Sequence, residues 1–173
     1  MTRANKDRIL RVDQAGEFGA KRIYEGQLAV MGSRAPHAQE VAGMAHQEEA
    51  HLATFDQMIA ERGVRPTLFQ PLWSRAGYLL GAATALVGPE AAMACTVAIE
   101  EEIDRHYSKQ LVELEESGDD PELAGHIRDF REDERGHRDA ALAAGAERAP
   151  AYPLLSGAIR LGCRLAIRLS ERI

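Results

Sequence analysis

The chain has 173 residues, 45% of them hydrophobic and only 5% aromatic, which suits one domain with a sizeable core and favours helices over sheets. Its formal charge of −6 argues against a nucleic-acid partner, which usually requires a basic surface. The charged N-terminus has no apolar segment and the two cysteines form no CxxC pair, so we expect neither a signal peptide nor a disulfide framework.

The first two predicted helices cover residues 7–31 and 37–62, as judged from the spacing of their apolar side chains. Pro36 separates them, because proline breaks a helix. Gly63 ends the second helix, since glycine readily adopts the left-handed conformation of a helix C-terminus. Glu17 falls on the apolar stripe of the first helix, where a charged residue is not expected.

A third helix is predicted over residues 72–87, which are mostly apolar and rich in small residues. Gly88 ends this helix, and Pro89 suits the first position of a long fourth helix that reaches about residue 116. Pro89 and Glu90 also divide the longest apolar region, residues 76–99. The uninterrupted run is therefore shorter than the roughly 18 residues of a membrane-spanning helix, and we do not expect one.

The fifth predicted helix opens at Pro121, and a proline-rich break at residues 149–153 precedes a last helix over residues 154–173. This last helix is apolar apart from Ser156, Ser170, Glu171 and a set of cations at four-residue spacing. That spacing keeps the cations on one slowly drifting face, as in helices that lie on anionic membranes. The cations are Arg160, Arg164, Arg168 and Arg172.

A second apolar surface is predicted over residues 68–87, which include Trp73 and several leucines. Together with residues 154–173 it would let the protein contact a membrane surface from outside. The other interpretation is that both segments pack within the domain or against another subunit, because buried and lipid-facing apolar segments look alike in a sequence.

Two Glu-x-x-His motifs carry the chemistry: Glu48 with His51, and Glu134 with His137. Residues three apart share a helix face, so each pair can reach a common metal ion. Either motif alone is a weak signal, since most such faces are simply solvated. The two motifs gain weight because each lies on the apolar stripe of its helix.

A lone glutamate precedes each motif at a similar distance: Glu17 stands 31 residues before Glu48, and Glu100 stands 34 residues before Glu134. The chain therefore repeats an antiparallel helix pair. Four glutamates in one core would repel one another strongly unless cations compensated their charge. Two divalent ions would do so, and the pattern matches the ligand set of ferritin-like four-helix bundles.

Oxygen and nitrogen ligands without thiolate suit iron or manganese better than structural zinc. We therefore predict a di-iron centre held by Glu17, Glu48, His51, Glu100, Glu134 and His137. Metal-bound imidazoles usually donate their second N–H to a carboxylate, and Asp133 is predicted to play this role for His51. The remaining acids near the motifs are expected to be surface charges. These are Glu49, Glu101, Glu102 and Glu132.

Several strings resemble one family over essentially the whole chain. They are RVDQAGEFGA at 11–20, ACTVAIEE at 94–101, APAYP at 149–153, GCRLAI at 162–167 and LSER at 169–172. These are similar to the demethoxyubiquinone hydroxylases of ubiquinone biosynthesis. The opening and closing strings are more specific than the metal motif.

The resemblance implies an all-α, ferritin-like four-helix bundle with additional apolar helices, making one domain over residues 1–173. It implies an O₂-dependent di-iron monooxygenase that hydroxylates a 2-polyprenyl-6-methoxy-3-methyl-benzoquinol. By analogy Glu48 and Glu134 would bridge the two iron ions, Glu17 and Glu100 would be terminal ligands, and one histidine would bind each ion. NADH is the expected reductant.

The expected location is the cytoplasmic face of the cell membrane, as a peripheral protein that meets its polyprenyl substrate and other ubiquinone-biosynthesis proteins there. His106 and Tyr107, one to two turns beyond Glu100, are candidates for an electron relay, and a packing role fits them equally well.

Two rival functions stay open. The first is iron storage or peroxide detoxification by a ferritin-like protein, although the apolar segments do not serve a soluble shell. The second is a manganese catalase or a rubrerythrin-like peroxidase, although a rubrerythrin usually carries a Cys-x-x-Cys iron module and none is present.

Overall fold

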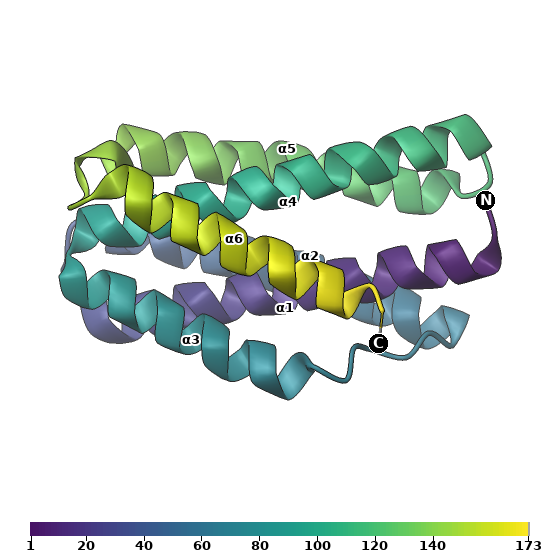
Figure 1. The fold of residues 1–173 in the computed structure, drawn as a ribbon, viewed down its shortest axis with the longest axis horizontal. Coiled ribbons are helices and arrows are strands. Elements are labelled where there is room, and N and C mark those ends of the chain that lie inside the picture. Colours follow the sequence, from purple (N-terminus) through teal and green to yellow (C-terminus); the bar gives the residue numbers. More distant parts are fainter. Residues whose placement is uncertain (173) are drawn as a thin grey trace.

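A computed structural model describes residues 1–172, and all regular structure in that range is helical (Figure 1). The bounds agree with the predicted ones to within a few residues at most ends. A short 3₁₀ turn, Ala146–Arg148, precedes the last helix. The helices are α1 (Arg3–Met31), α2 (Ala38–Arg62), α3 (Gln70–Val87), α4 (Pro89–Ser117), α5 (Pro121–Ala143) and α6 (Tyr152–Ser170).

Local chemistry sets several of these bounds. The hydroxyl of Thr2 accepts a hydrogen bond from the backbone N–H of Asn5 and so caps α1. The carboxylate of Asp120 caps α5 in the same way through Leu123. Gly63 ends α2 with φ at +65°, a left-handed conformation that costs other residues more.

Helices α1, α2, α4 and α5 form a four-helix bundle in which α1 pairs with α2 and α4 pairs with α5 (Figure 1). Its core has two apolar clusters. One lies toward the start of α4 and includes Tyr24, Met44 and Met93; the other lies toward the end of α4 and includes Phe55 and Ile127. All six predicted metal ligands fall in sequence between the members of these clusters. The bundle is therefore closed by apolar packing on both sides of a polar centre.

Helices α3 and α6 lie on one side of the bundle, with α3 mainly against α1 and α6 mainly against α4. The α1–α3 contact depends on glycine: a Cβ on Gly26 or on Gly81 would overlap the facing backbone at Tyr78 or at Ile23. Backbones can approach this closely only where no side chain intervenes. Helix α3 is thereby held against α1.

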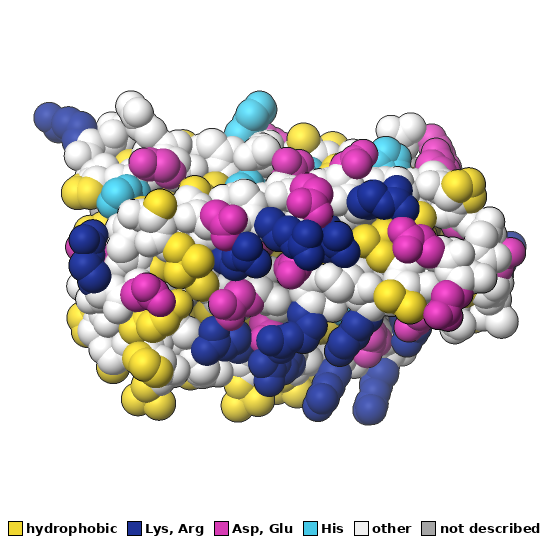
Figure 2. Space-filling model, turned by 90° about the horizontal axis from the view of Figure 1, so that it is seen from above, with side chains coloured by type: hydrophobic (Ala, Val, Ile, Leu, Met, Phe, Trp, Pro, Cys, Tyr) yellow, Lys and Arg dark blue, Asp and Glu magenta, His cyan; other side chains and the backbone are white. Residues whose placement is uncertain are grey.

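The outward faces of α3 and α6, which we call the outer layer, expose large apolar side chains. In Figure 2, hydrophobic and basic side chains project together from the lower edge, where α6 lies. Among the described helices, none combines the length and apolar character that crossing a bilayer requires. The exposed side chains are Leu72, Leu79, Leu86 and Val87 on α3, Leu154, Leu161 and Leu165 on α6, and Leu68 just before α3.

The structure corrects the expectation that the cations of residues 154–173 share a free face. Arg160 donates a hydrogen bond to Glu101 at 2.6 Å. Arg164 donates two hydrogen bonds to Glu102, at 2.8 and 2.9 Å. The prediction that Glu102 is a surface charge is therefore wrong: its residue is only 3% exposed, because α6 docks over it. Docking between helices distant in sequence is not visible in the local pattern.

Candidate metal centre

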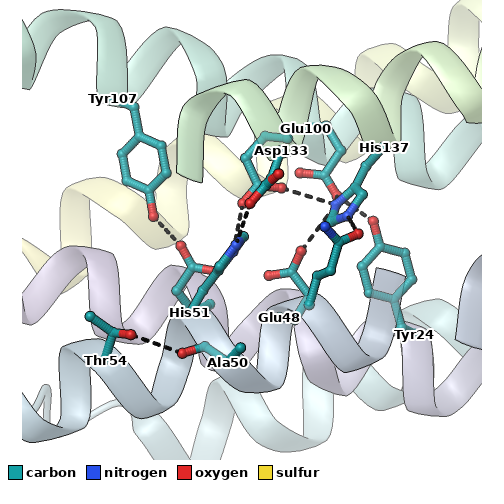
Figure 3. A network of polar contacts seen from close by, with 12 residues as sticks. Tyr24, Glu48, Ala50, His51, Thr54, Glu100, Tyr107, Asp133 and His137 are labelled. Carbon is teal, nitrogen blue, oxygen red and sulfur yellow. Dashed lines mark hydrogen bonds and ion pairs between the residues drawn. The ribbon is translucent and has the colours of Figure 1, made fainter. Parts of the chain in front are cut away.

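All six predicted ligands meet inside the bundle and are buried (Figure 3). They form two overlapping groups whose nearest donor atoms lie within 4.8 Å of one another. Glu48 and Glu134 belong to both groups. The first group is completed by Glu17 and His51, and the second is completed by Glu100 and His137.

Several donor atoms at this centre have no hydrogen-bond partner among residues 1–172. Both carboxylate oxygens of Glu48 are in this state, as is one oxygen each of Glu17, Glu100 and Glu134. Nδ1 of His51 is buried without a hydrogen bond as well. Unsatisfied buried polar atoms are costly and rare, so this convergence fits residues arranged around cations.

The protonation of the four carboxyl groups reflects the same crowding. Burial raises the pKa of Glu48 and of Glu100 well above the usual range, and the nearby charge of Glu134 raises both further. Burial acts on Glu134 too, but contacts with His137 and His51 outweigh it and lower its pKa. The protein alone thus stabilises this centre only in part, through bound protons and two histidines.

The two imidazoles lie with Nδ1 toward the carboxylates. Nδ1 of His51 is 3.3 Å from Glu134, and Nδ1 of His137 is 3.2 Å from both Glu48 and Glu134. Burial lowers the pKa of His51, but the carboxylates of Glu134 and Glu17 more than compensate and raise it to about 10. A metal ion here would therefore have to displace protons.

On the opposite edge of each ring, Nε2 meets an acceptor from a helix of the other half. Nε2 of His51 lies 3.1 Å from Oδ2 of Asp133, which is the contact predicted for that residue. Nε2 of His137 lies 2.9 Å from Oε1 of Gln47. Gln47 was missed in the sequence, although it holds the same place before Glu48 that Asp133 holds before Glu134.

Two tyrosines complete the centre, one at each end in Figure 3. The hydroxyl of Tyr24 donates to Glu100, and that of Tyr107 donates to Glu17. Each tyrosine follows its own helix's glutamate by seven residues, and α1 and α4 are antiparallel, so each reaches the glutamate of the other helix. A repeated Glu-x₆-Tyr spacing was the available signal, and it would have identified Tyr24.

The other singled-out residues lie away from the two ligand groups. His106 faces Asp13 at 3.6 Å and Gln110 at 2.8 Å, so of the relay candidates only Tyr107 touches a predicted ligand. Glu49 and Glu132 are exposed, as predicted for surface charges. Cys95 and Cys163 are both free.

A cavity of about 580 Å³ lies between the bundle and the outer layer, walled by α1, α3, α4 and α6. Its lining is almost wholly apolar, and Glu102, held by Arg164, is its one acidic residue among those described. Gly16 and Ile99 line it, and each is the immediate neighbour of a predicted ligand. A Cβ on Gly16 would meet nothing within 4 Å, so the wall is open there.

The comparisons with known proteins agree with one another. The family model described as ubiquinone biosynthesis protein COQ7 matches residues 4–170. A 3-demethoxyubiquinol 3-hydroxylase of Rhodospirillum rubrum is 57% identical over 168 residues, covering 96% of this chain and 78% of the relative.

Two eukaryotic relatives are more distant but equally complete in coverage. The mitochondrial NADPH-dependent 3-demethoxyubiquinone 3-hydroxylase of Homo sapiens is 49% identical, over 100% of this chain and 80% of its own length. The mitochondrial 5-demethoxyubiquinone hydroxylase of Saccharomyces cerevisiae is 41% identical, over 96% of this chain and 78% of its own length.

Proposed function

The chain belongs to the family described as ubiquinone biosynthesis protein COQ7, and from this premise we propose that it is a monooxygenase that hydroxylates a demethoxyubiquinol. The substrate would be a 2-polyprenyl-6-methoxy-3-methyl-benzoquinol, as the sequence strings imply. The observation that carries the proposal is the pair of buried carboxylate–histidine groups beside an apolar cavity. One domain over residues 1–173 would hold both.

The residues fit two iron ions. Glu48 and Glu134, which belong to both groups, would bridge the ions, while Glu17 with His51 and Glu100 with His137 would each complete one position. The donor set of carboxylate oxygens and imidazole nitrogens suits iron, and the buried oxygens without a hydrogen-bond partner in the described residues would be available to hold the ions. When bound, the iron pair would supply the activation of O₂.

The protein itself would position the metal ligands and exclude water from the centre. Tyr24 and Tyr107 hold the carboxylates of Glu100 and Glu17, so the terminal ligands keep their orientation. The two apolar clusters keep water from the centre. In the overall reaction one oxygen atom enters the ring as a hydroxyl group and the other leaves as water, with consumption of two electrons and two protons.

The cavity is the proposed site for the quinol. Its apolar lining suits a polyprenyl chain, and its volume falls in the usual range for small-molecule sites, about 300–1,000 Å³. The ring would lie near Gly16 and Ile99, next to the predicted ligands Glu17 and Glu100. The tail would extend between α3 and α6, whose inner faces line the cavity.

Membrane contact is proposed for the outer layer. Leu79 on α3 and Leu154 and Leu161 on α6 are each at least 65% exposed, an unusual state for large apolar side chains. Arg168 and Arg172, which are exposed on or just after α6, would favour an anionic surface. The proposed location is the cytoplasmic face of the cell membrane, where other ubiquinone-biosynthesis proteins would act.

A reduced nicotinamide nucleotide is the proposed source of electrons. NADH follows from the family resemblance, whereas the name of the human relative specifies NADPH. Tyr107 is the better relay candidate, because its hydroxyl contacts Glu17, whereas His106 contacts Asp13, which is not a predicted ligand. Stopped-flow reduction of the iron-loaded protein by each nucleotide would identify the donor, and Tyr107→Phe should slow that reduction.

Lipid analysis of cells that lack the protein tests the function directly. Such cells should accumulate the demethoxy intermediate, which is lighter by one methoxy group, and lose mature ubiquinone. A plasmid with the wild-type chain should restore ubiquinone, and Glu134→Ala should not. Mass spectrometry of lipid extracts measures both pools.

The same experiment separates the rival functions. A ferritin-like storage or peroxide-scavenging protein would leave the quinone profile intact and alter iron content or peroxide sensitivity instead. Normal ubiquinone in cells with no second enzyme for this step would refute the hydroxylase proposal and leave the metal centre standing.

A further inference from the structure

The metal centre repeats the same four-part pattern in its two halves, with one difference. In each half a glutamate is followed by a tyrosine seven residues later, and a Glu-x-x-His motif is preceded by one polar residue that contacts the other half's histidine. That polar residue is Gln47 in the first half and Asp133 in the second. One imidazole is therefore backed by an amide and the other by a carboxylate.

Both contacts fix the same tautomer. An acceptor oxygen at Nε2 keeps a proton on that nitrogen, so Nδ1, which lies 3.2–3.3 Å from the carboxylates, is the nitrogen that can exchange its proton for a metal ion. A ring of either histidine turned the other way would direct Nε2 at the metal position and lose its contact with Gln47 or Asp133. Gln47 and Asp133 are thus positioning residues, since each acts through an imidazole and neither is among the six donors.

The two acceptors differ in charge. A carboxylate that accepts the Nε2–H makes the imidazole a stronger donor to a metal, whereas a neutral amide orients the ring without adding charge. The Asp133 side chain is 44% exposed, so solvent weakens this effect without removing it.

The aromatic contacts of the two histidine rings also differ, and again His51 is the more firmly held. His51 stacks on Phe130 with centroids 4.0 Å apart, while His137 makes only an edge contact with Tyr24 at 6.3 Å. The His51 ring is therefore held on its face and at its outer edge, whereas the His137 ring is held mainly at its edge. A ring that is already ordered loses less freedom when it binds an ion.

From these differences we infer that the two metal positions are inequivalent, and that the position formed by Glu17 and His51 binds its ion more tightly than the one formed by Glu100 and His137. This inference rests on the proposed metal centre. Expected differences are about 10-fold, the lower end of what the partner of a metal-bound histidine contributes.

Stepwise binding of Mn²⁺ to the full chain, stripped beforehand with a chelator, tests the inference by the electron paramagnetic resonance signal of the free ion. The wild type should bind two ions in two steps about 10-fold apart. Asp133→Asn should weaken the tight step toward the weak one. Gln47→Glu should strengthen the weak step, a gain that a merely structural role would not produce.

The double variant Gln47→Glu with Asp133→Asn exchanges the two acceptors and should retain two steps. In that background His137→Ala should remove the tight step, whereas in the wild-type background His51→Ala should remove it. Glu132→Gln is the matched control, because it removes an exposed negative charge next to Asp133 without touching His51. Far-ultraviolet circular dichroism confirms that each variant is folded.

Two equal binding steps in the wild type would overturn the inference, as would equal effects of Asp133→Asn and Glu132→Gln. Either result would leave the proposed function intact. No binding of Mn²⁺ or Fe²⁺ at all would instead refute the metal centre itself.

Discussion

The interior of the bundle and the outer layer depart in opposite directions from a rule for soluble proteins. In such proteins charged side chains are usually exposed and large apolar side chains are usually buried. Glu17, Glu48, Glu100 and Glu134 are fully buried in the bundle, while leucines on α3 and α6 are more than half exposed. Both arrangements are costly for an isolated chain, because buried charges lose hydration and exposed apolar surface orders water. Under the proposed function a different ligand would offset each cost: metal ions in the bundle and a membrane surface at the outer layer.

The regions also differ in what holds them. The buried carboxylates come from four helices that apolar clusters lock on both sides. Helix α6 is attached to α4 beside the cavity through ion pairs of Arg160 and Arg164 as well as apolar packing. The predicted metal ligands thus lie in a frame that is packed on both sides, whereas α6, one wall of the cavity, is held in part by two ion pairs.

The largest expected effect would break the comparison at the buried end. Glu48→Ala removes a carboxylate shared by both donor groups, so the purified protein should fall from about two iron ions per chain to none. Glu49→Ala is the matched control, since Glu49 is exposed and paired with Lys21, and it should keep its iron. Elemental analysis measures both. Loss of iron from Glu49→Ala alone would mean that the helix register is wrong.

The next effect concerns the space between the two regions. Gly16→Leu should project a side chain into the cavity beside Glu17 and lower hydroxylation by roughly 100-fold, while iron content stays normal. Gly43→Leu makes the same change on an exposed face of α2 and should be silent in both assays. Full activity of the Gly16 variant would place the quinol elsewhere.

A smaller effect is expected at the exposed end. Leu161→Glu combined with Leu165→Glu should weaken binding to anionic lipid vesicles about 10-fold or more, because both leucines are exposed and burying apolar surface in the bilayer interface favours binding. Val112→Glu alters an equally exposed side chain on α4, outside the outer layer, and should bind as the wild type does. Co-sedimentation with vesicles measures the difference.

The smallest expected effect is a dependence of stability on pH, which arises from the buried ionisable groups of the bundle. In chelator-stripped protein, His51 has a raised pKa of about 10, so its contribution to stability is complete below pH 6.5 and is lost as the pH rises to 10. The raised pKa values of Glu48 and Glu100 act in the same direction, because their ionisation at higher pH opposes folding.

The melting temperature of the stripped protein should therefore fall between pH 6.5 and 10, by an amount on the order of 5 °C. Iron-loaded protein should fall less, since the metal takes the place of the protons. Differential scanning calorimetry at several pH values measures this. A stripped protein that becomes more stable over that interval would contradict the assigned pKa shifts.

Sequence reasoning reached the helices and the ligand groups because both follow from short-range spacing. Three residues separate each motif's glutamate from its histidine, and that spacing alone places both on one face of a helix. The convergence of Glu17 and Glu100 on those motifs followed from the repeated helix pair. The contacts of Tyr24 and Gln47 belong to the same repeat and were accessible in principle.

Features that depend on how distant helices pack against one another could not be predicted from the sequence. The burial of Glu102 and the pairing of Arg160 arise because α6 lies across α4, more than fifty residues away in the chain. The cavity likewise exists only between four packed helices. The spacing of arginines in α6 predicts a cationic stripe but does not reveal that two of those cations have partners.

One segment of α4 has a consequence for how this protein can change. All residues from 91 to 100 are buried, so this part of the helix has no face toward solvent. In a comprehensive substitution library, tolerance along most helices should rise and fall with a period near 3.6 residues. Over residues 91–100 this periodicity should be absent. Nearly every substitution of an alanine there by a larger residue should destabilise the protein, since the small side chains set how closely the neighbouring helices approach.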